Sequence, residues 1–88
     1  MNLTVTGIAE QNGVKNVSFS ANNPKTKFWL ETEALKRWAQ IQQNSAPVGS
    51  IVVAYADGIW YYADITDNVE IGETITMTEF GGGSPDLS

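Results

Sequence analysis

The chain contains neither cysteine nor histidine among its 88 residues. Without thiolate or imidazole groups it cannot form a Cys/His zinc site, a thiol nucleophile or a Ser-His-Asp triad. Carboxylates, lysines and tyrosines remain as candidate catalytic groups, and no spacing among them matches a catalytic site or a calcium-binding loop. We therefore expect a binding protein that is not an enzyme and that uses neither a metal ion nor a cofactor.

Long hydrophobic runs are absent as well. The longest, residues 51–56, is far shorter than the roughly 18 apolar residues that cross a lipid bilayer. The N-terminal residues have neither the basic start nor the apolar block of a secretion signal. We expect a protein of the cytoplasm, of a cell or of an infected host cell, that does not bind membranes.

Basic residues are few, and they are confined to the first part of the chain. All five of them, together with three of the ten acidic residues, precede residue 38; they are Lys15, Lys25, Lys27, Lys36 and Arg37. The other seven acidic residues follow, and the formal net charge is −5. This asymmetry predicts a weakly basic patch on an otherwise acidic molecule.

The length and composition are typical of one small globular domain, with 42% hydrophobic and 17% charged residues. Residues 1–80 contain the strand and helix patterns and predict a single domain. Residues 81–88 begin with three glycines, followed by Ser84 and Pro85, and predict a flexible tail.

A β-hairpin is predicted at the start of the chain. Residues 3–9 alternate apolar and polar side chains, and Gly7 within them indicates a β-bulge or a sharp bend. The Asn12-Gly13 pair predicts a tight turn into a second strand, residues 14–21.

The third predicted strand, residues 25–31, has two chemically distinct sides. One side has Thr26, Phe28 and Leu30, and the other has Lys25, Lys27, Trp29 and Glu31. We expect the side with Trp29 to face outward. A shift of one residue in register would instead bury Trp29 and expose Phe28.

A helix is predicted after the third strand. Thr32 is suited to cap a helix N-terminus, and apolar residues then recur at positions 34, 35, 38 and 41. Residues 44–47, Asn-Ser-Ala-Pro, would end the helix. This pattern predicts about three helical turns with Trp38 in the core.

A second hairpin is predicted around Asp57-Gly58, between strands at residues 51–56 and 59–65. The pairs counted outward from the turn are Ala56 with Ile59, Tyr55 with Trp60, Ala54 with Tyr61, Val53 with Tyr62, Val52 with Ala63 and Ile51 with Asp64. The uncharged side is predicted to face the core, which leaves Tyr55, Trp60 and Tyr62 as an outward aromatic cluster.

A last strand is predicted at residues 73–80, with Ile75 and Met77 facing inward. The order of elements, which is three strands, a helix, a hairpin and one further strand, resembles the oligonucleotide/oligosaccharide-binding barrel, the OB-fold. Residues 48–53 followed by residues 57–65 resemble the fourth and fifth strands of small phage-type single-stranded DNA-binding proteins.

This resemblance covers about residues 3–66, and the hairpin is also similar to that of Tudor and SH3-like barrels. The OB resemblance implies a mainly β fold, a β-barrel with one α-helix, in the order β-β-β-α-β-β. The extra C-terminal strand at residues 73–80 is an addition that neither family explains. The OB resemblance also implies that a ligand lies across the second and third strands, between the Asn12-Gly13 and Asp57-Gly58 turns. On this chain that surface consists of Asn16, Ser18, Ser20, Lys25, Lys27 and Trp29.

Single-stranded nucleic acid is bound by cationic groups that contact phosphates and by aromatic rings on which bases stack. The candidate nucleic-acid-binding residues are therefore Lys15, Asn16, Ser18, Ser20, Lys25, Lys27, Trp29, Tyr55, Trp60 and Tyr62. An alternative for the three hairpin aromatics is that they stabilise their own sheet.

We predict a protein that binds single-stranded nucleic acid, with DNA expected before RNA. No residue is identified that would contact a 2′-hydroxyl. The competing hypothesis is a small acidic interaction module or inhibitor that docks on a partner protein through the aromatic hairpin and its acidic half, since a net charge of −5 repels phosphates. An unpaired last strand would also allow a homodimer.

Overall fold

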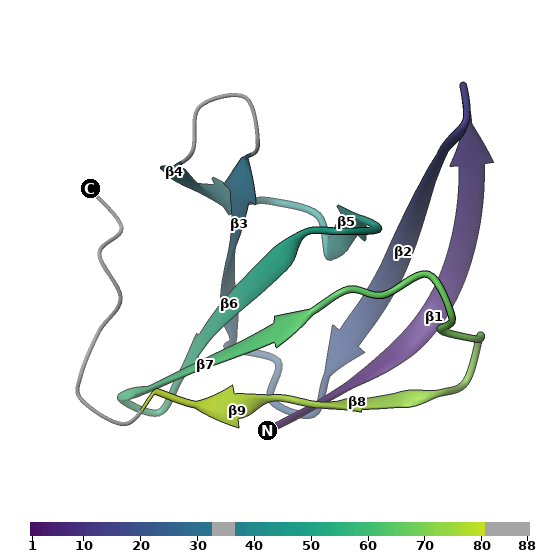
Figure 1. The fold of residues 1–88 in the computed structure, drawn as a ribbon. Helices are drawn as coiled ribbons and strands as arrows, with labels where there is room; N and C mark the ends of the chain where they lie inside the picture. Colours follow the sequence, from purple (N-terminus) through teal and green to yellow (C-terminus); the bar gives the residue numbers. More distant parts are fainter. Residues whose placement is uncertain (33–36, 81–88) are drawn as a thin grey trace.

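The computed structural model describes residues 1–32 and 37–80, which form two antiparallel β-sheets (Figure 1). Sheet A has four strands in the order β5-β2-β1-β8, and sheet B has five in the order β4-β3-β6-β7-β9. The strands are β1 (Asn2–Gln11), β2 (Val14–Ala21), β3 (Lys27–Thr32), β4 (Arg37–Ile41), β5 (Ser45–Pro47), β6 (Ile51–Ala56), β7 (Ile59–Asp64), β8 (Thr74–Thr76) and β9 (Thr78–Glu79). The predicted mainly β class is confirmed, whereas the tail predicted at residues 81–88 lies outside the described residues.

Two hairpin turns have the geometry that their sequences predict. The φ angles are 53° and 76° at Asn12 and Gly13, and 53° and 79° at Asp57 and Gly58. Positive φ at both central residues is typical of a type I′ turn, whose twist matches that of the flanking strands. The register of β6 with β7 agrees with the predicted one at all six pairs.

The bulge predicted at Gly7 is present in β1. The register with β2 shifts between Val5 and Gly7, which leaves Thr6 as the extra residue. The extra residue resets the alternation of side chains, so Ile8 faces the interior on the same side as Val5. Ile8 packs there against the buried core.

The predicted helix is wrong for residues 37–41, which form β4 and pair with β3 in antiparallel register. Its first residues, 33–36, lie outside the described part of the chain. The apolar positions also suit a strand, since Trp38 faces one side of sheet B and Ile41 the other. Pairing with β3 bonds the backbone of β4 into sheet B and adds Trp38 to its outer side, and these long-range contacts outweigh the helical spacing.

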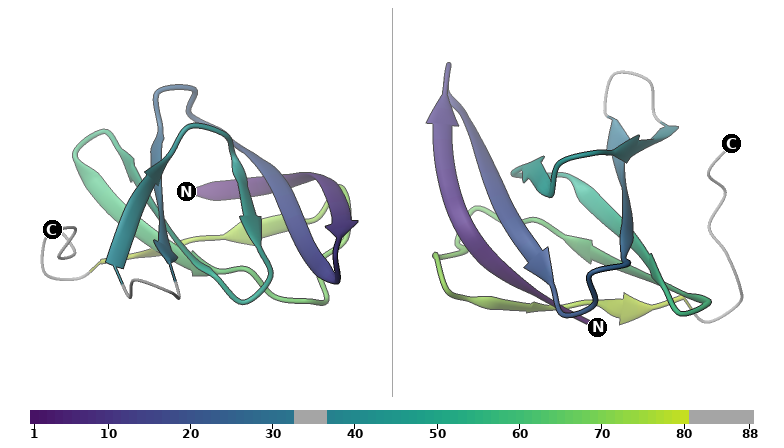
Figure 2. Two further views of the ribbon diagram at one scale, coloured as in Figure 1. Left: turned by 90° about the horizontal axis from the view of Figure 1, so that it is seen from above. Right: turned by 180° about the vertical axis from the view of Figure 1, so that it is seen from behind.

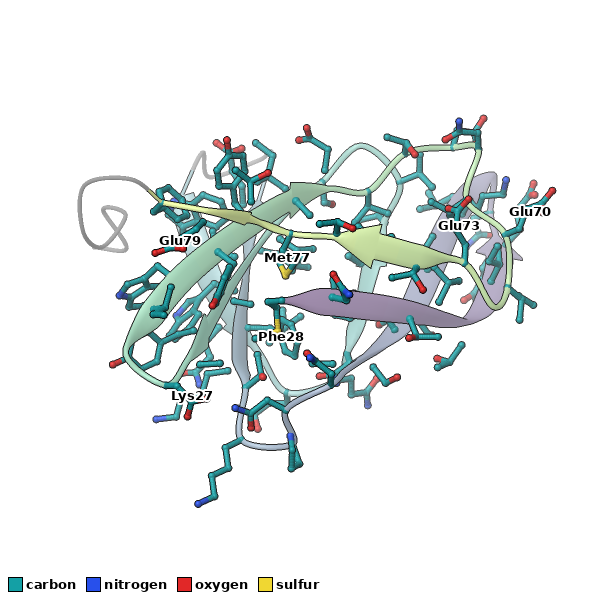
Figure 3. The ribbon with its side chains drawn as sticks, turned by 90° about the horizontal axis from the view of Figure 1, so that it is seen from below. Lys27, Phe28, Glu70, Glu73, Met77 and Glu79 are labelled. Carbon is teal, nitrogen blue, oxygen red and sulfur yellow. The ribbon has the colours of Figure 1, made fainter. Side chains whose placement is uncertain are left out.

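Residues 74–79 join the two sheets. In this segment β8 pairs with β1 of sheet A, and β9 pairs with β7 of sheet B (Figure 3). Between them, the Met77 N–H donates to the carbonyl oxygen of Met1 at 2.9 Å. Among the described strands, β8 and β9 each end the order of their sheet and have a partner on one side only, so pairing of this segment across a homodimer stays a prediction.

The predicted closed barrel with a helix is not formed by the described residues. The segment expected to be helical adds β4 to the edge of sheet B, and the chain then crosses to β5 in sheet A through residues 42–44. The ladder of strand pairs does not continue from β4 to β5 within the described part. The two sheets meet at residues 74–79 and diverge away from that segment (Figure 2).

The hydrophobic core lies between the inner sides of the two sheets. Phe19 and Phe28 meet there edge to face, with ring centroids 5.3 Å apart, and Met77 lies in the same cluster (Figure 3). The buried cluster consists of Leu3, Val5, Val17, Phe19, Phe28, Ala46, Val52, Ala54, Ala63, Ile65, Val69 and Met77. None of the polar side chains that the structure describes is buried, so apolar contacts hold the sheets together.

Alanine substitutions at Gly58 and Gly7 are predicted to differ in their effect on stability. Gly58 has a φ of +79°, where a Cβ atom costs roughly 1–2 kcal/mol, so Gly58→Ala lowers the free energy of unfolding by about that amount. Gly7 has no positive φ, and its Cβ would meet the Ser18 Cβ at an ordinary 3.7 Å. Gly7→Ala therefore changes stability by less than about 0.5 kcal/mol. Equal losses of stability in urea unfolding would contradict this difference.

Candidate functional site: the aromatic face of sheet B

Six of the nine aromatic residues of the chain gather on the outer side of sheet B. We call this side the aromatic face; its aromatic residues are Trp29, Trp38, Tyr55, Trp60, Tyr62 and Phe80. They gather because β3, β6 and β7 each place aromatic residues at alternate positions, and the registers align those positions across the sheet.

The middle of the aromatic face is a row of residues that runs across all five strands. In order from β4 to β9 the cross-strand partners are Gln40, Trp29, Val53, Tyr62 and Thr78. Val53 is 0% exposed although it lies on the outer side, with Trp29 and Tyr62 on the neighbouring strands at either side. The aromatic residues therefore flank an apolar centre.

A second row lies beside the first, toward the β6–β7 turn. It runs from Lys27 through Tyr55 to Trp60, and Phe80 continues it by donating its N–H to the Trp60 carbonyl oxygen at 2.9 Å. We call this side of the face the lysine end. Lys27 is exposed, and so is Lys25 in the loop before β3.

The rings of the two rows contact one another in two groups. Trp60 lies 4.5 Å from Tyr55 and 5.2 Å from Trp29, measured between ring centroids, with tilts of 46° in both pairs. Tyr62 lies 4.9 Å from Phe80. Such contacts contribute about 0.5–1.5 kcal/mol per pair beyond their buried area, so the rings do stabilise their own sheet.

The same rings still present surface to solvent. Tyr62 is 37% exposed, and the other five aromatic side chains of the face are half-buried. Large apolar groups kept at a surface are typical of a binding site. Stabilisation of the sheet and contact with a ligand are therefore compatible roles for this face.

On the opposite side of the face, the charged side chains that the structure describes are carboxylates. Glu31 lies beyond Trp29 on β3, and Asp64 lies beyond Tyr62 on β7; both are exposed. Trp38 is the cross-strand partner of Glu31 on β4. We call this side the acidic end. The core position predicted for Trp38 is wrong, because β4 replaces the helix that would have turned it inward.

Asn23 holds the lysine end together. Its side chain donates to Asp57 Oδ2 at 3.0 Å and accepts the Lys25 backbone N–H at 2.9 Å, while its carbonyl oxygen accepts the Thr26 hydroxyl at 2.7 Å. These bonds tie the β2–β3 loop, which contains Lys25, to the β6–β7 turn. Asn23 is not among the predicted site residues, although its position before Pro24 is a turn signal in the sequence.

Five of the ten predicted site residues come together on the aromatic face. They are Lys27, Trp29, Tyr55, Trp60 and Tyr62. The register predicted for the third strand is confirmed, because Phe28 is 3% exposed in the core and Trp29 faces outward. Lys25 is exposed in the loop before β3. Trp38 and Phe80 also belong to the aromatic face but are missing from the predicted site residues. The alternation of side chains over Thr78, Glu79 and Phe80 is the signal in the sequence that could have revealed Phe80.

The remaining predicted site residues lie elsewhere. Asn16, Ser18 and Ser20 are on the outer side of sheet A, because β2 and β3 belong to different sheets. Lys15 is held by Asp67, with its Nζ 3.1 Å from Oδ1 and 3.3 Å from the backbone carbonyl oxygen. The predicted surface across the second and third strands is thus divided between the two sheets.

Within residues 1–32 and 37–80, no group of three or more acidic side chains is arranged to hold a metal ion. The described residues also include no helix that is long and apolar enough to span a membrane. Comparisons with protein-family models, with curated proteins and with solved structures found no match to this chain. The candidate site therefore depends on the chemistry of the aromatic face alone.

The contact between Trp29 and Trp60 is predicted to give an exciton couplet in the far-ultraviolet circular dichroism spectrum, because the two indole rings lie 5.2 Å apart. Trp29→Phe and Trp60→Phe should each abolish the couplet. Trp38→Phe is the matched control and should leave the couplet intact. Among the aromatic pairs described, Trp38 has no ring contact with Trp29 or Trp60. A couplet that survives either of the first two substitutions would show that the rings are not paired.

Proposed function

We propose that the protein binds single-stranded nucleic acid, in the first instance DNA, on the aromatic face. The observation that carries this proposal is the position of Lys27 directly across from Tyr55, at the border of the contacting rings of Trp29, Tyr55 and Trp60. Flat rings beside a cation are the two features that unpaired bases and their phosphates require.

Stacking supplies most of the binding energy in this proposal. Each base stacked on an aromatic side chain contributes about 1–3 kcal/mol. The two ring groups, around Trp60 and around Tyr62, offer places for two or three bases. Part of this energy offsets the loss of freedom on association, so we expect dissociation constants in the micromolar range rather than the nanomolar range.

Electrostatic attraction contributes less. Lys25 and Lys27 offer two phosphate contacts, which correspond to a log–log salt slope of about −1.4 on single strands. The net charge of −5 further weakens the long-range attraction. A duplex, whose bases are already stacked on one another, gains little from the rings, so the proposed site prefers single strands.

The proposal differs from what the OB resemblance implies about the position of the ligand. The proposed surface consists of β3, β6 and β7 of sheet B, and β2 takes no part in it. The resemblance to small phage-type single-stranded DNA-binding proteins supports the proposal only in that both use a curved β surface for oligonucleotides.

Docking of a basic protein on the same face is the second candidate function. The observation that favours it is the acidic end, where Glu31 and Asp64 are exposed next to half-buried aromatic rings. Trp and Tyr are frequent anchors of protein interfaces, and carboxylates around them suit a cationic partner.

Titration of the intrinsic tryptophan fluorescence with a mixed-sequence oligodeoxynucleotide at low salt distinguishes the two candidates. We expect quenching by the single strand and little change with the matching duplex. In fluorescence anisotropy with a labelled single strand, Trp29→Ala should weaken binding roughly 5- to 150-fold, as expected for the loss of one stacked base. Trp29→Phe keeps a flat ring and should recover most of the affinity.

Ser20→Ala is the matched control for this experiment. Ser20 is an exposed residue on the outer side of sheet A, so its substitution should leave the affinity unchanged. The proposal fails if the wild-type protein gives no signal with high micromolar single strand, or if Trp29→Ala binds as well as Ser20→Ala. Capture of basic proteins on the immobilised chain would then test the second candidate.

A further inference from the structure

We infer from the charges around the aromatic face that a bound strand crosses the β-strands at the lysine end, and that Glu31 and Asp64 keep its phosphates away from the acidic end. This inference rests on the proposed function and adds a path and a length to it. Glu31 and Asp64 then limit the number of nucleotides that bind to the aromatic face.

The distances along the strands separate the two ends. Glu31 is four residues beyond Lys27 on β3, and Asp64 is four residues beyond Trp60 on β7. Four residues of a strand span about 13 Å. This exceeds the Debye length of about 8 Å at physiological salt, so a phosphate at Lys27 is largely screened from both carboxylates.

A path along β3 would bring phosphates against the acidic end. A phosphate about 5 Å from one exposed carboxylate loses roughly fourfold in affinity at low salt, and the loss multiplies when two carboxylates are near. A path across the strands avoids Glu31 and Asp64. It passes from Lys27 over Tyr55 and Trp60 toward Phe80, and it covers about 14 Å from β3 to β9. The β6–β7 turn beside this path contains one exposed carboxylate, Asp57, which accepts a hydrogen bond from the Asn23 side chain and would act on short and long strands alike.

The number of ring groups on this path sets the length of strand that the face accepts. Trp29 with Tyr55 and Trp60 forms one group, and Tyr62 with Phe80 forms the other. Two or three bases find a ring there. Additional nucleotides either leave the sheet or approach Glu31 and Asp64, so the affinity should level off at about three nucleotides. A longer strand gains only because it can bind in a larger number of registers.

The experiment compares a labelled trinucleotide and a labelled decanucleotide of deoxythymidine by fluorescence anisotropy at low salt. Glu31→Gln and Asp64→Asn should each raise the affinity for the decanucleotide about two- to fourfold and that for the trinucleotide by less than about 1.7-fold, as estimated from the Coulomb energies in water at about 5 Å and about 13 Å. Both gains should disappear at high salt. Lys27→Gln should weaken binding of both lengths.

Glu70→Gln is the matched control, because it removes the same charge at the other end of the molecule. Glu70 is exposed in the loop before β8, far from Lys27 (Figure 3). Its substitution should not change the ratio of the two affinities. Thermal unfolding of each variant checks that the fold is retained.

Two outcomes overturn the inference in distinguishable ways. If Glu31→Gln and Asp64→Asn change the ratio of affinities no more than Glu70→Gln does, while Trp29→Ala still weakens binding, the path is wrong and the proposed function stands. If the wild-type protein binds neither oligonucleotide, the proposed function is wrong and the inference is overturned with it.

Discussion

The pairing of β3 with β6 is the interaction on which the rest of sheet B depends. These strands are far apart in the sequence, and their register places Phe28 against Ala54 on the inner side and Trp29 against Val53 on the outer side. A shift of one residue would move every side chain of β3 to the other side of the sheet. The core and the aromatic face would then be lost together, so the same pairing determines both stability and surface chemistry.

The outer sides of the two sheets differ in the chemistry that they offer. Sheet A presents small uncharged polar residues, such as Thr4, Ser20 and Thr74, which lie in one cross-strand row. Sheet B presents aromatic rings that lose part of their exposed surface to one another. Water is a good solvent for the first surface and a poor one for the second. Among the described residues, aromatic surface is therefore concentrated on the outer side of sheet B.

Local features of the fold could be predicted from the sequence. Both type I′ turns follow from Asn-Gly and Asp-Gly pairs, and the bulge at Gly7 and the register of the second hairpin follow from local patterns as well. Alternation also places Phe28 and Trp29 on opposite sides of β3, whereas the pairing with β6 decides that Phe28 faces the core. The turns, the bulge and the hairpin register depend on neighbouring residues alone, which is why a single sequence is sufficient for them.

The features that were wrong or missing depend on residues distant in the sequence. Spacing of three and four residues around Trp38 suits a helix, but residues 37–41 pair with β3, and that pairing is available only once sheet B is assembled. The division of the predicted site has the same origin. Alternation correctly places Ser18 and Trp29 outward on their own strands, yet it cannot tell that β2 and β3 belong to different sheets.

The joint at residues 74–79 has a consequence for how the chain acquires its structure. β1 pairs with β2 nearby, but its other neighbour is β8, and Asn2 pairs with Thr76 across almost the whole described chain. Synthesis begins at the N-terminus, so the two hairpins can form long before β8 has left the ribosome. Pairings between such distant segments are slow to close. A nascent chain that stops before residue 72 would hold its hairpins without the segment that joins sheet A to sheet B, and its apolar inner sides would be open to solvent and to other chains.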